Sequence, residues 1–345
     1  STGGAYVVTS RTSTVRDSSL LPATLSSTAD GYVVAVGSKY PAYYKYEAAS
    51  KKWLETGAPS GGYTGFTSMP ISISNVSGWA LNSGAYEGRY AGDSDSNPEH
   101  AFMRALTPLT GMSAYQGRLV LLQGSRVSMS ASNNPRRFYR STVTTLLDSD
   151  PIEVGAGSLS SAMFRHAVAF NKDLVLFGDK VQAVMPGNNA AITPRTASIM
   201  LTSAFDTGNT VPPVTTGQTM IYPADRGDTF GFLEMLPSSN VDSIYSTLDV
   251  TTHLPTYFVG DCKFSTSSPV ARMAVFGTTA NPKVLYVHEY LWDSDTSKAQ
   301  SAWHKWEFQL DIASAVFVGS KLMLLFSKGV TANLCVMDPR MPNPY

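Results

Sequence analysis

The sequence has 345 residues, of which 43% are hydrophobic, and its 26 Lys and Arg residues are balanced by 26 Asp and Glu residues. A net charge of 0 excludes a general attraction to nucleic acid or to an anionic membrane surface and leaves only a local patch for such contacts. Charged residues are only 15% of the chain and aromatic residues are 11%, a balance that favours a β-rich protein with many turns over a helical one.

The first 70 residues predict a β-rich N-terminal region. Strand-like runs separated by turn residues stand at Ala5–Thr9, Gly31–Val36, Ala42–Glu47 and Lys52–Glu55. The Gly- and Ser-rich stretch Thr56–Pro70 indicates a linker or a long surface loop, and we place a domain boundary at residue 70. No signal peptide or membrane-spanning run is visible. The sequence begins at Ser1 without an initiator methionine and enters strand-like sequence almost at once, so we expect a fragment of a longer chain.

The segment His166–Met185 contains the clearest structural unit. An apolar strand is followed by the turn Asn171–Asp173, the apolar run Leu174–Phe177, the turn Gly178–Lys180 and a further strand, which is the pattern of a β-meander. Similar units recur at a spacing of roughly 50 residues. The first core positions of these units are Leu119, Leu174, Met220, Met273 and Leu322.

This period predicts stacked β-sheets. One small meander cannot bury both of its faces, and a four-stranded blade with its loops uses roughly 40–50 residues. We therefore predict an all-β fold in which residues 71–345 form a β-propeller-like body of about five or six small antiparallel blades, with an additional β-rich N-terminal region. Five units are recognisable, so a sixth blade would have to be completed from elsewhere. A β-sandwich or an irregular all-β body is the alternative.

The cysteines and two tryptophans carry further structural expectations. Cys262 and Cys335 lie in apolar, strand-like contexts, and buried free thiols explain them better than a disulfide or a metal pair. Trp303 and Trp306 are three residues apart on one predicted strand and should face opposite sides. We expect one to pack between blades and the other to lie at a surface or subunit contact.

The acidic run after Gly88 resembles the start of a calcium-binding loop. Alternating oxygen-bearing side chains begin at Asp93 and continue to Glu99, as in such a loop. However, the glycine expected at the sixth position is Pro98, and the bidentate glutamate expected at the twelfth is Arg104. We therefore expect a solvated turn there and predict no metal site.

Carboxylates near two predicted turns are the candidates for enzymatic chemistry. Asp148, Asp150 and Glu153, or Asp293 with Asp295, could form the carboxylate pair of a glycoside hydrolase. Asp before Pro or Ser is also ordinary turn chemistry. The five histidines show no metal-binding spacing, and neither a nucleophile elbow nor a phosphate-binding loop occurs. We predict no catalytic residues and no cofactor.

A long acid-free stretch is the main charge feature of the chain. No Asp, Glu or Lys lies between Glu99 and Asp148, although arginines and aromatic residues occur there. Arginine on extended structure beside aromatic residues can follow a phosphate backbone, or can pair with carboxylates of another subunit. Scattered surface arginines balanced by distant acids are the alternative. The candidate DNA or subunit contacts are Arg104, Arg118, Arg126, Arg136, Arg137 and Arg140.

A series of motifs resembles the nozzle proteins (tail tubular protein B) of T7-like short-tailed bacteriophages, podoviruses. The matches are collinear from about Tyr44 to Asp338, which makes the resemblance specific. They comprise Gly88–Asp93 with Asn97-Pro98, Gly117–Leu119, Arg126–Ser130, Asp148–Ile152, Arg165–Val168, Asn171–Gly178, Ile192–Pro194, Asp249–Pro255 and Gln300–Glu307.

The resemblance implies a structural virion protein and not an enzyme. Such proteins form a six-fold ring at the distal end of the tail, below an adaptor (gatekeeper) protein and with tail fibres as neighbours, and double-stranded DNA leaves through the channel during ejection. It also implies a β-propeller, assembly in the host cytoplasm, and sequence missing before Ser1 and after Tyr345. The alternative from another class is a propeller-type glycosidase or cell-wall hydrolase associated with the tail.

Overall fold

The computed structural model describes residues 14–59, 72–75, 79–82, 86–104, 108–157, 162–187, 191–208, 211–238, 244–294 and 297–340. The predicted strand Ala5–Thr9 and most of the Gly- and Ser-rich stretch lie outside these residues. The described residues are almost entirely strands and loops, with one short α-helix, α1 (Ala101–Arg104), and two 3-10 turns, η1 (Ser18–Leu20) and η2 (Ser27–Ala29). None of the helices that they contain is long and apolar enough to cross a membrane.

The N-terminal sheet confirms three of the predicted strands. Its strands are β1 (Thr14–Val15), β2 (Val33–Val36), β3 (Ala42–Glu47) and β4 (Lys52–Thr56), in that spatial order. β1 runs parallel to β2, and the other pairs are antiparallel. Two further strands, β5 (Ser72–Asn75) and β6 (Trp79–Asn82), form a separate antiparallel hairpin.

Five antiparallel meanders, which we call the first to fifth blades, follow along the chain. The first blade contains β7 (Gly111–Tyr115), β8 (Arg118–Gln123), β9 (Arg126–Met129) and β10 (Ile152–Gly155), and the second contains β11 (Phe164–Phe170), β12 (Asp173–Gly178), β13 (Gln182–Met185) and β14 (Met200–Ser203). The third contains β15 (Val214–Thr215), β16 (Met220–Asp225), β17 (Thr229–Pro237), β18 (Tyr245–Asp249) and β19 (Phe258–Val259). The fourth contains β20 (Cys262–Ser268), β21 (Met273–Thr278), β22 (Val284–Trp292) and β23 (Lys298–Glu307), and the fifth contains β24 (Asp311–Val318), β25 (Lys321–Lys328) and β26 (Thr331–Met337).

The five predicted core positions each lie in the second strand of a blade, namely in β8, β12, β16, β21 and β25. Each of these strands has a strand on either side, and those of the first four blades also have apolar clusters against their faces. Every residue of β12 and β21 is buried. The roughly 50-residue period therefore predicted the blades correctly.

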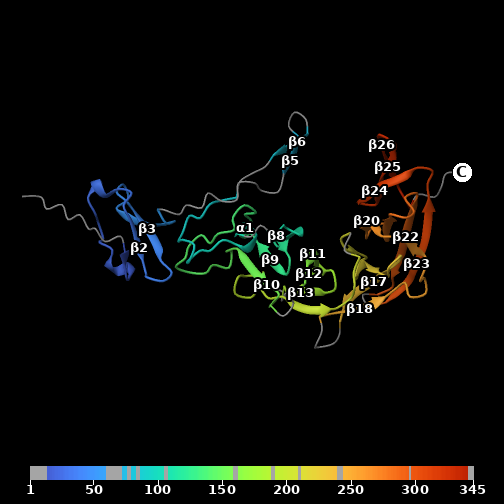
Figure 1. Ribbon diagram of the computed structural model, residues 1–345, viewed down its shortest axis with the longest axis horizontal. Helices are drawn as coiled ribbons and strands as arrows, with labels where there is room; N and C mark the ends of the chain where they lie inside the picture. The colour runs from blue at the N-terminus through green and yellow to red at the C-terminus, as the bar shows by residue number, and fades with distance from the viewer. Residues whose placement is uncertain are drawn as a thin grey trace, which may run out of the picture.

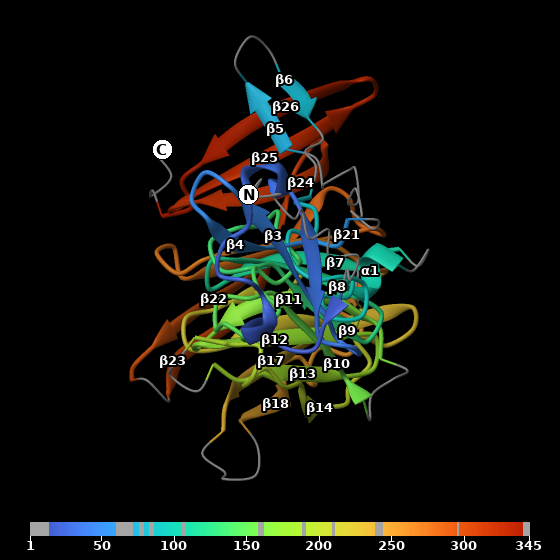
Figure 2. The same ribbon diagram turned by 90° about the vertical axis from the view of Figure 1, so that its left-hand side faces the viewer.

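The blades stand in a curved, open row. From the N-terminal sheet at one end, the first four blades follow one another along the long axis in chain order, and the row then turns so that the fifth blade lies above the fourth in this view (Figure 1). Seen from the N-terminal side, the sheets lie one behind another (Figure 2). Contacts join successive blades: β7 and β8 contact β11, β14 contacts β18, β15 contacts β20, and β20 and β21 contact β24.

Four apolar clusters fill the four spaces between successive blades. Leu122 and Leu176 meet between the first and second blades, and Phe177 and Tyr222 between the second and third. Between the third and fourth blades the cluster includes Phe232. A further cluster between the fourth and fifth blades contains residues such as Val287 and Leu324. Since both faces of each intermediate blade are buried in this way, the body is held together by sheet-on-sheet stacking.

The turn at Asn171 explains why this meander was recognisable from its sequence. Asn171 and Lys172 have φ values of 45° and 73°, in the left-handed region that a two-residue hairpin turn requires at both positions. Asn accepts this conformation more readily than most residues. The hairpin turn between β7 and β8 in the first blade has the same left-handed conformation at Gln116 and Gly117, with φ values of 46° and 71°.

Two expectations about single residues need correction. Cys262 is buried as expected, but Cys335 is an exposed free cysteine, because it lies on β26 at the edge of the last blade. Trp303 and Trp306 do face opposite sides of β23, yet both pack between blades. Trp303 contacts the cluster between the third and fourth blades, and Trp306 contacts the cluster between the fourth and fifth.

Candidate nucleic-acid or subunit interface

The six candidate arginines lie on and around the first blade. Arg118 and Arg126 begin β8 and β9, and Arg104 ends α1. The other three, Arg136, Arg137 and Arg140, lie in the long connection between β9 and β10. Their environments differ, and the differences decide which side chains are available to a partner.

Arg118 is an internal cross-link. Its side chain is buried, and its guanidinium donates hydrogen bonds to three backbone carbonyls: Nη1 to Ser130 (2.8 Å) and Asp150 (2.7 Å), and Nη2 to Asp148 (2.7 Å). Burial lowers the pKa of Arg118, and the charge of Asp150 opposes this shift. Because these donors are used within the fold, Arg118 holds the end of β9 against the start of β10.

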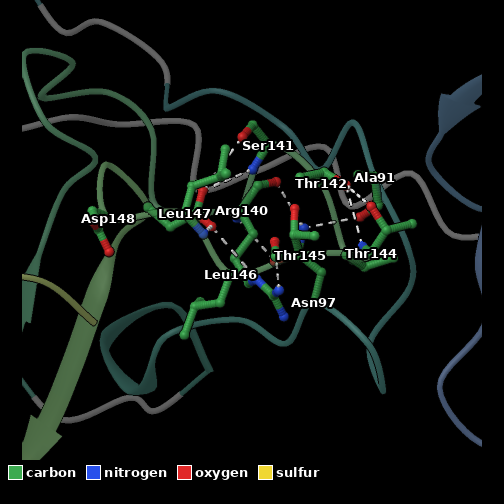
Figure 3. Close-up of polar contacts among 12 residues, drawn as sticks. Ala91, Asn97, Arg140, Ser141, Thr142, Thr144, Thr145, Leu146, Leu147 and Asp148 are labelled. Atoms are coloured by element: carbon green, nitrogen blue, oxygen red, sulfur yellow. Dashed lines mark hydrogen bonds and ion pairs between the residues drawn. The ribbon is translucent and has the colours of Figure 1, made fainter. Parts of the chain in front are cut away.

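Arg140, in the connection between β9 and β10, is also bonded within the fold (Figure 3). Its backbone N–H donates to Asn97 Oδ1 (3.0 Å), and its Nη2 donates to the carbonyl of Thr145 (3.1 Å). Asn97 in turn donates from Nδ2 to the carbonyls of Ala91 (2.9 Å) and Arg140 (3.1 Å). These bonds join the loop before α1 to the loop before β10.

Asp150, a candidate for hydrolase chemistry, anchors this loop. Its side chain is fully buried, accepts hydrogen bonds from the backbone N–H groups of Leu147 (2.9 Å) and Ser141 (3.3 Å), and lies 3.8 Å from Arg140 Nε. Asp148 is 71% exposed and lies 3.7 Å from Arg195. Glu153 accepts a hydrogen bond from the N–H of Ala101, at the start of α1 (2.6 Å). The three carboxylates thus have separate structural partners.

The acidic run after Gly88 is a tightly bonded turn. Asp93 Oδ1 accepts hydrogen bonds from the N–H groups of Asp95 and Ser96, both at 3.0 Å, and Oδ2 accepts one from the hydroxyl of Tyr43 on β3 (3.0 Å). Burial raises the pKa of Asp93, but these hydrogen bonds outweigh it and lower the pKa overall. Within the described ranges no cluster of His, Cys, Asp and Glu is able to hold a metal ion.

Arg104, Arg126 and Arg136 are the exposed members of the set. They do not form one patch. Arg126 pairs with Gly155 at one end of the first blade, whereas Arg136 lies beyond the other end of β9, where its carbonyl accepts a hydrogen bond from the N–H of Glu87 (2.9 Å). The four-residue strand between them is roughly 13 Å long at the usual rise per residue. Arg137 is partly buried.

One cleft was not predicted from the sequence. It has a volume of about 830 Å³ and is lined by residues of the second and third blades, of the connection between them, and by Asp261. Its charges are of both signs. Arg165 Nε lies 2.8 Å from Asp179 within the lining, and Arg226 Nη2 lies 2.5 Å from Asp249, which is not a lining residue. The lining residues come from turns far apart in the sequence, so no local motif could reveal the cleft.

Comparison with known proteins places the chain among phage tail proteins. A family model described as bacteriophage nozzle protein matches residues 3–341. The tail tubular protein gp12 of Escherichia phage T7 is 23% identical over 269 residues, which is 77% of this chain and 33% of that protein. The chain therefore spans about a third of the length of this relative.

Solved structures give weaker likenesses. The β-propeller domain of Cps50 (Swd1) from Myceliophteria thermophila has a TM-score of 0.42 at 9% identity, over 88% of this chain and 79% of that one. Hsv2p from Kluyveromyces lactis has a TM-score of 0.39 at 9% identity, over 90% and 72%. Likenesses at this level carry no argument about function.

Proposed function

The chain belongs to the bacteriophage nozzle protein family, and from this premise we propose that it forms part of the tail nozzle through which DNA leaves a short-tailed phage. The family is one of structural tail proteins and not of enzymes. The observation that carries the proposal is the family match over residues 3–341. The carboxylates Asp148, Asp150 and Glu153 have separate structural partners, which gives the enzyme alternative no support from them. Asp295 of the other candidate pair lies outside the described residues.

The stacked blades suit a scaffold for such a channel. Their interiors are filled by apolar clusters, so the functional contacts fall to the loops and to the exposed arginines. Arg104, Arg126 and Arg136 are available to DNA phosphates or to carboxylates of a neighbouring subunit. Arg118 and Arg140 hold the loop before β10 in place from within the fold.

The proposed role also requires assembly with other copies and other tail proteins. In keeping with the family resemblance, the subunits form a homo-hexamer, contact a tail adaptor protein and the tail fibres, and surround double-stranded DNA during retention and ejection. The protein is made in the host cytoplasm and ends in the virion tail. Membership of the nozzle protein family supports the proposed hexamer, its partners and its place in the tail.

Electron microscopy of purified phage particles tests the proposal. A map of the intact tail should contain six copies of the five-blade body around the distal part of the channel. A tail map into which this chain does not fit, with particles that contain no copy of the chain by mass spectrometry, would refute the proposed function.

A further inference from the structure

The N-terminal sheet docks on two loops of the first blade through polar contacts. It stands at one end of the row (Figure 1). Tyr43 on β3 donates a hydrogen bond from its hydroxyl to Asp93 Oδ2 (3.0 Å). Glu55 on β4 accepts one from the backbone N–H of Val143 (2.7 Å) and one from the hydroxyl of Thr142 (2.5 Å). In both contacts a carboxylate is the acceptor, once on the loop and once on the sheet.

A short backbone bridge completes this joint. The N–H of Ala58, just after β4, donates to the carbonyl of Gly92 (3.0 Å), and the N–H of Gly92 donates to the carbonyl of Thr56 (3.2 Å). Gly92 has a φ of 69°, and an ideal Cβ at this position would lie only 2.7 Å from Cγ1 of Val143. The close packing at Gly92 therefore requires glycine, so the loop is shaped for this contact.

The N-terminal sheet has a small core of its own. Tyr46 is fully buried there, and its ring centroid lies 5.3 Å from that of Trp53. The hydroxyl of Tyr46 accepts a hydrogen bond from the N–H of Leu25 (2.9 Å) and donates one to its carbonyl (3.0 Å). The five apolar clusters of the described residues contain no residue of this sheet. The sheet can therefore leave the first blade without losing its own core.

This joint should be the weakest in the row. Water competes for the donors and acceptors of a polar contact, so the net contribution of its hydrogen bonds is small. Each interface between two blades, in contrast, removes a cluster of apolar side chains from water. Local opening of a folded protein occurs where few apolar contacts are buried. Opening at the joint therefore costs less free energy than opening between two blades.

The two loops that receive the sheet are also held from the side of the first blade. Asp150 Oδ1 accepts a hydrogen bond from the N–H of Ser141 (3.3 Å). Asn97 donates to the carbonyls of Ala91 (2.9 Å) and Arg140 (3.1 Å), which ties one loop to the other (Figure 3). None of these bonds involves the N-terminal sheet, so the loops can keep their course when the sheet is absent.

We propose that the N-terminal sheet is a docked module that opens from the first blade as one body, with Tyr43–Asp93 and Glu55–Val143 as its releasable contacts. The structure shows the closed form. In the open form water satisfies the two carboxylates and their former donors, while the sheet and the blades keep their internal hydrogen bonds. This motion does not depend on a role in the tail.

Double electron–electron resonance between two spin labels measures the opening. The labels are attached through Lys52→Cys on β4 and Met112→Cys on β7, both at exposed positions, in a protein whose exposed Cys335 is replaced by Ser. The distance distribution should contain a main component from the docked sheet and a minor component from the open form. A second pair of labels, at Met112→Cys and Met200→Cys, joins the first and second blades and should give one component. A single component for the first pair would overturn the proposal.

A pair of matched variants links the opening to the polar contacts. Tyr43→Phe with Glu55→Ala removes both side-chain contacts and leaves the hydrogen bonds within the Asp93 turn in place. The open population should rise roughly fivefold or more, the effect of losing about one net hydrogen bond. Tyr44→Phe with Glu47→Ala makes the same chemical changes on β3, where Glu47 bonds to Ser50, and should leave the open population unchanged. Equal distributions in the two variants would contradict the proposal.

Hydrogen–deuterium exchange separates opening of the joint from a general loosening of the fold. In the variant that lacks both contacts, the amide of Val143 should exchange faster, because it has lost its acceptor. The amides of β8 and β12, in the buried middle of the first two blades, should exchange as in the unmodified protein. Faster exchange in these strands, or a broadened distribution between the labels on the first and second blades, would overturn the proposal.

Discussion

At the scale of single residues, Arg118 stabilises the fold, although the sequence suggested a contact with DNA or another subunit. Replacement by Gln should lower the free energy of unfolding by about 3 kcal/mol, because buried carbonyls lose charged donors. Arg126→Gln, on an exposed side chain of the same blade, should change it by less than about 0.5 kcal/mol. Urea denaturation of both variants measures the difference. Equal stability of the two proteins would contradict the internal role of Arg118.

The Asp93 turn predicts a pH dependence of stability. Its folded-state pKa lies below the ordinary value of 3.8, so its contribution is present above about pH 4 and is lost as the pH falls through the folded pKa. Asp93→Asn should therefore flatten the loss of stability below about pH 4. Denaturation series at several pH values measure the slope, with Asp95→Asn as the control. An unchanged slope for the Asp93 variant would show that the turn does not stabilise the charged form.

The exposed arginines predict the salt dependence of DNA binding. Replacing Arg104, Arg126 and Arg136 by Gln should weaken binding to double-stranded DNA and reduce the slope of log affinity against log salt by roughly 0.9 for each lost phosphate contact. A matched variant with Lys39, Lys51 and Lys52 replaced by Gln removes the same charge from the N-terminal sheet. If both variants bind DNA as tightly as the unmodified protein, these arginines do not contact DNA, and only a contact with another subunit remains as their proposed role.

The hairpin turn between β11 and β12 belongs to the scale of elements. Lys172 has a φ of 73°, which a residue with a side chain adopts at a cost. Lys172→Gly produces the Asn-Gly pair that this turn prefers and should raise the free energy of unfolding by about 0.5–1 kcal/mol. Lys180→Gly, in the next turn, is the control. Thermal unfolding gives the comparison, and a less stable Lys172 variant would contradict the assigned turn geometry.

The elements also show what the sequence could predict. Second strands such as β12 are apolar at nearly every position because they are covered on both faces, so their period was visible without the structure. Short outer strands such as β14 are more exposed and left no comparable signal. The roles of Arg118 and Asp150 could not be predicted, because their partners come from loops whose course depends on the packed blade. The same reason explains Cys335, whose exposure follows from the place of β26 in the row.

At the scale of the whole molecule, the outer strand of the fifth blade predicts self-association, because β26 is largely exposed and no described strand pairs with its other edge. In a polypeptide of residues 1–345, the uncharged edge of β26 should pair weakly with other β-edges, so the sedimentation coefficient should rise with protein concentration. Val336→Lys should suppress this rise. Val259→Lys, at a valine that is 40% exposed on β19, should not. Concentration-independent sedimentation of the unmodified polypeptide would contradict the prediction.

The row of blades has a mechanical consequence. The four blade interfaces lie in series, and the main contacts among the described residues join successive blades, as in repeat proteins. A small rotation at each interface therefore adds to the next, and the two ends of the row gain the largest freedom of movement. Within one blade, by contrast, backbone hydrogen bonds hold the strands rigid. A molecule built in this way can change its overall curvature by small steps while every individual sheet keeps its shape.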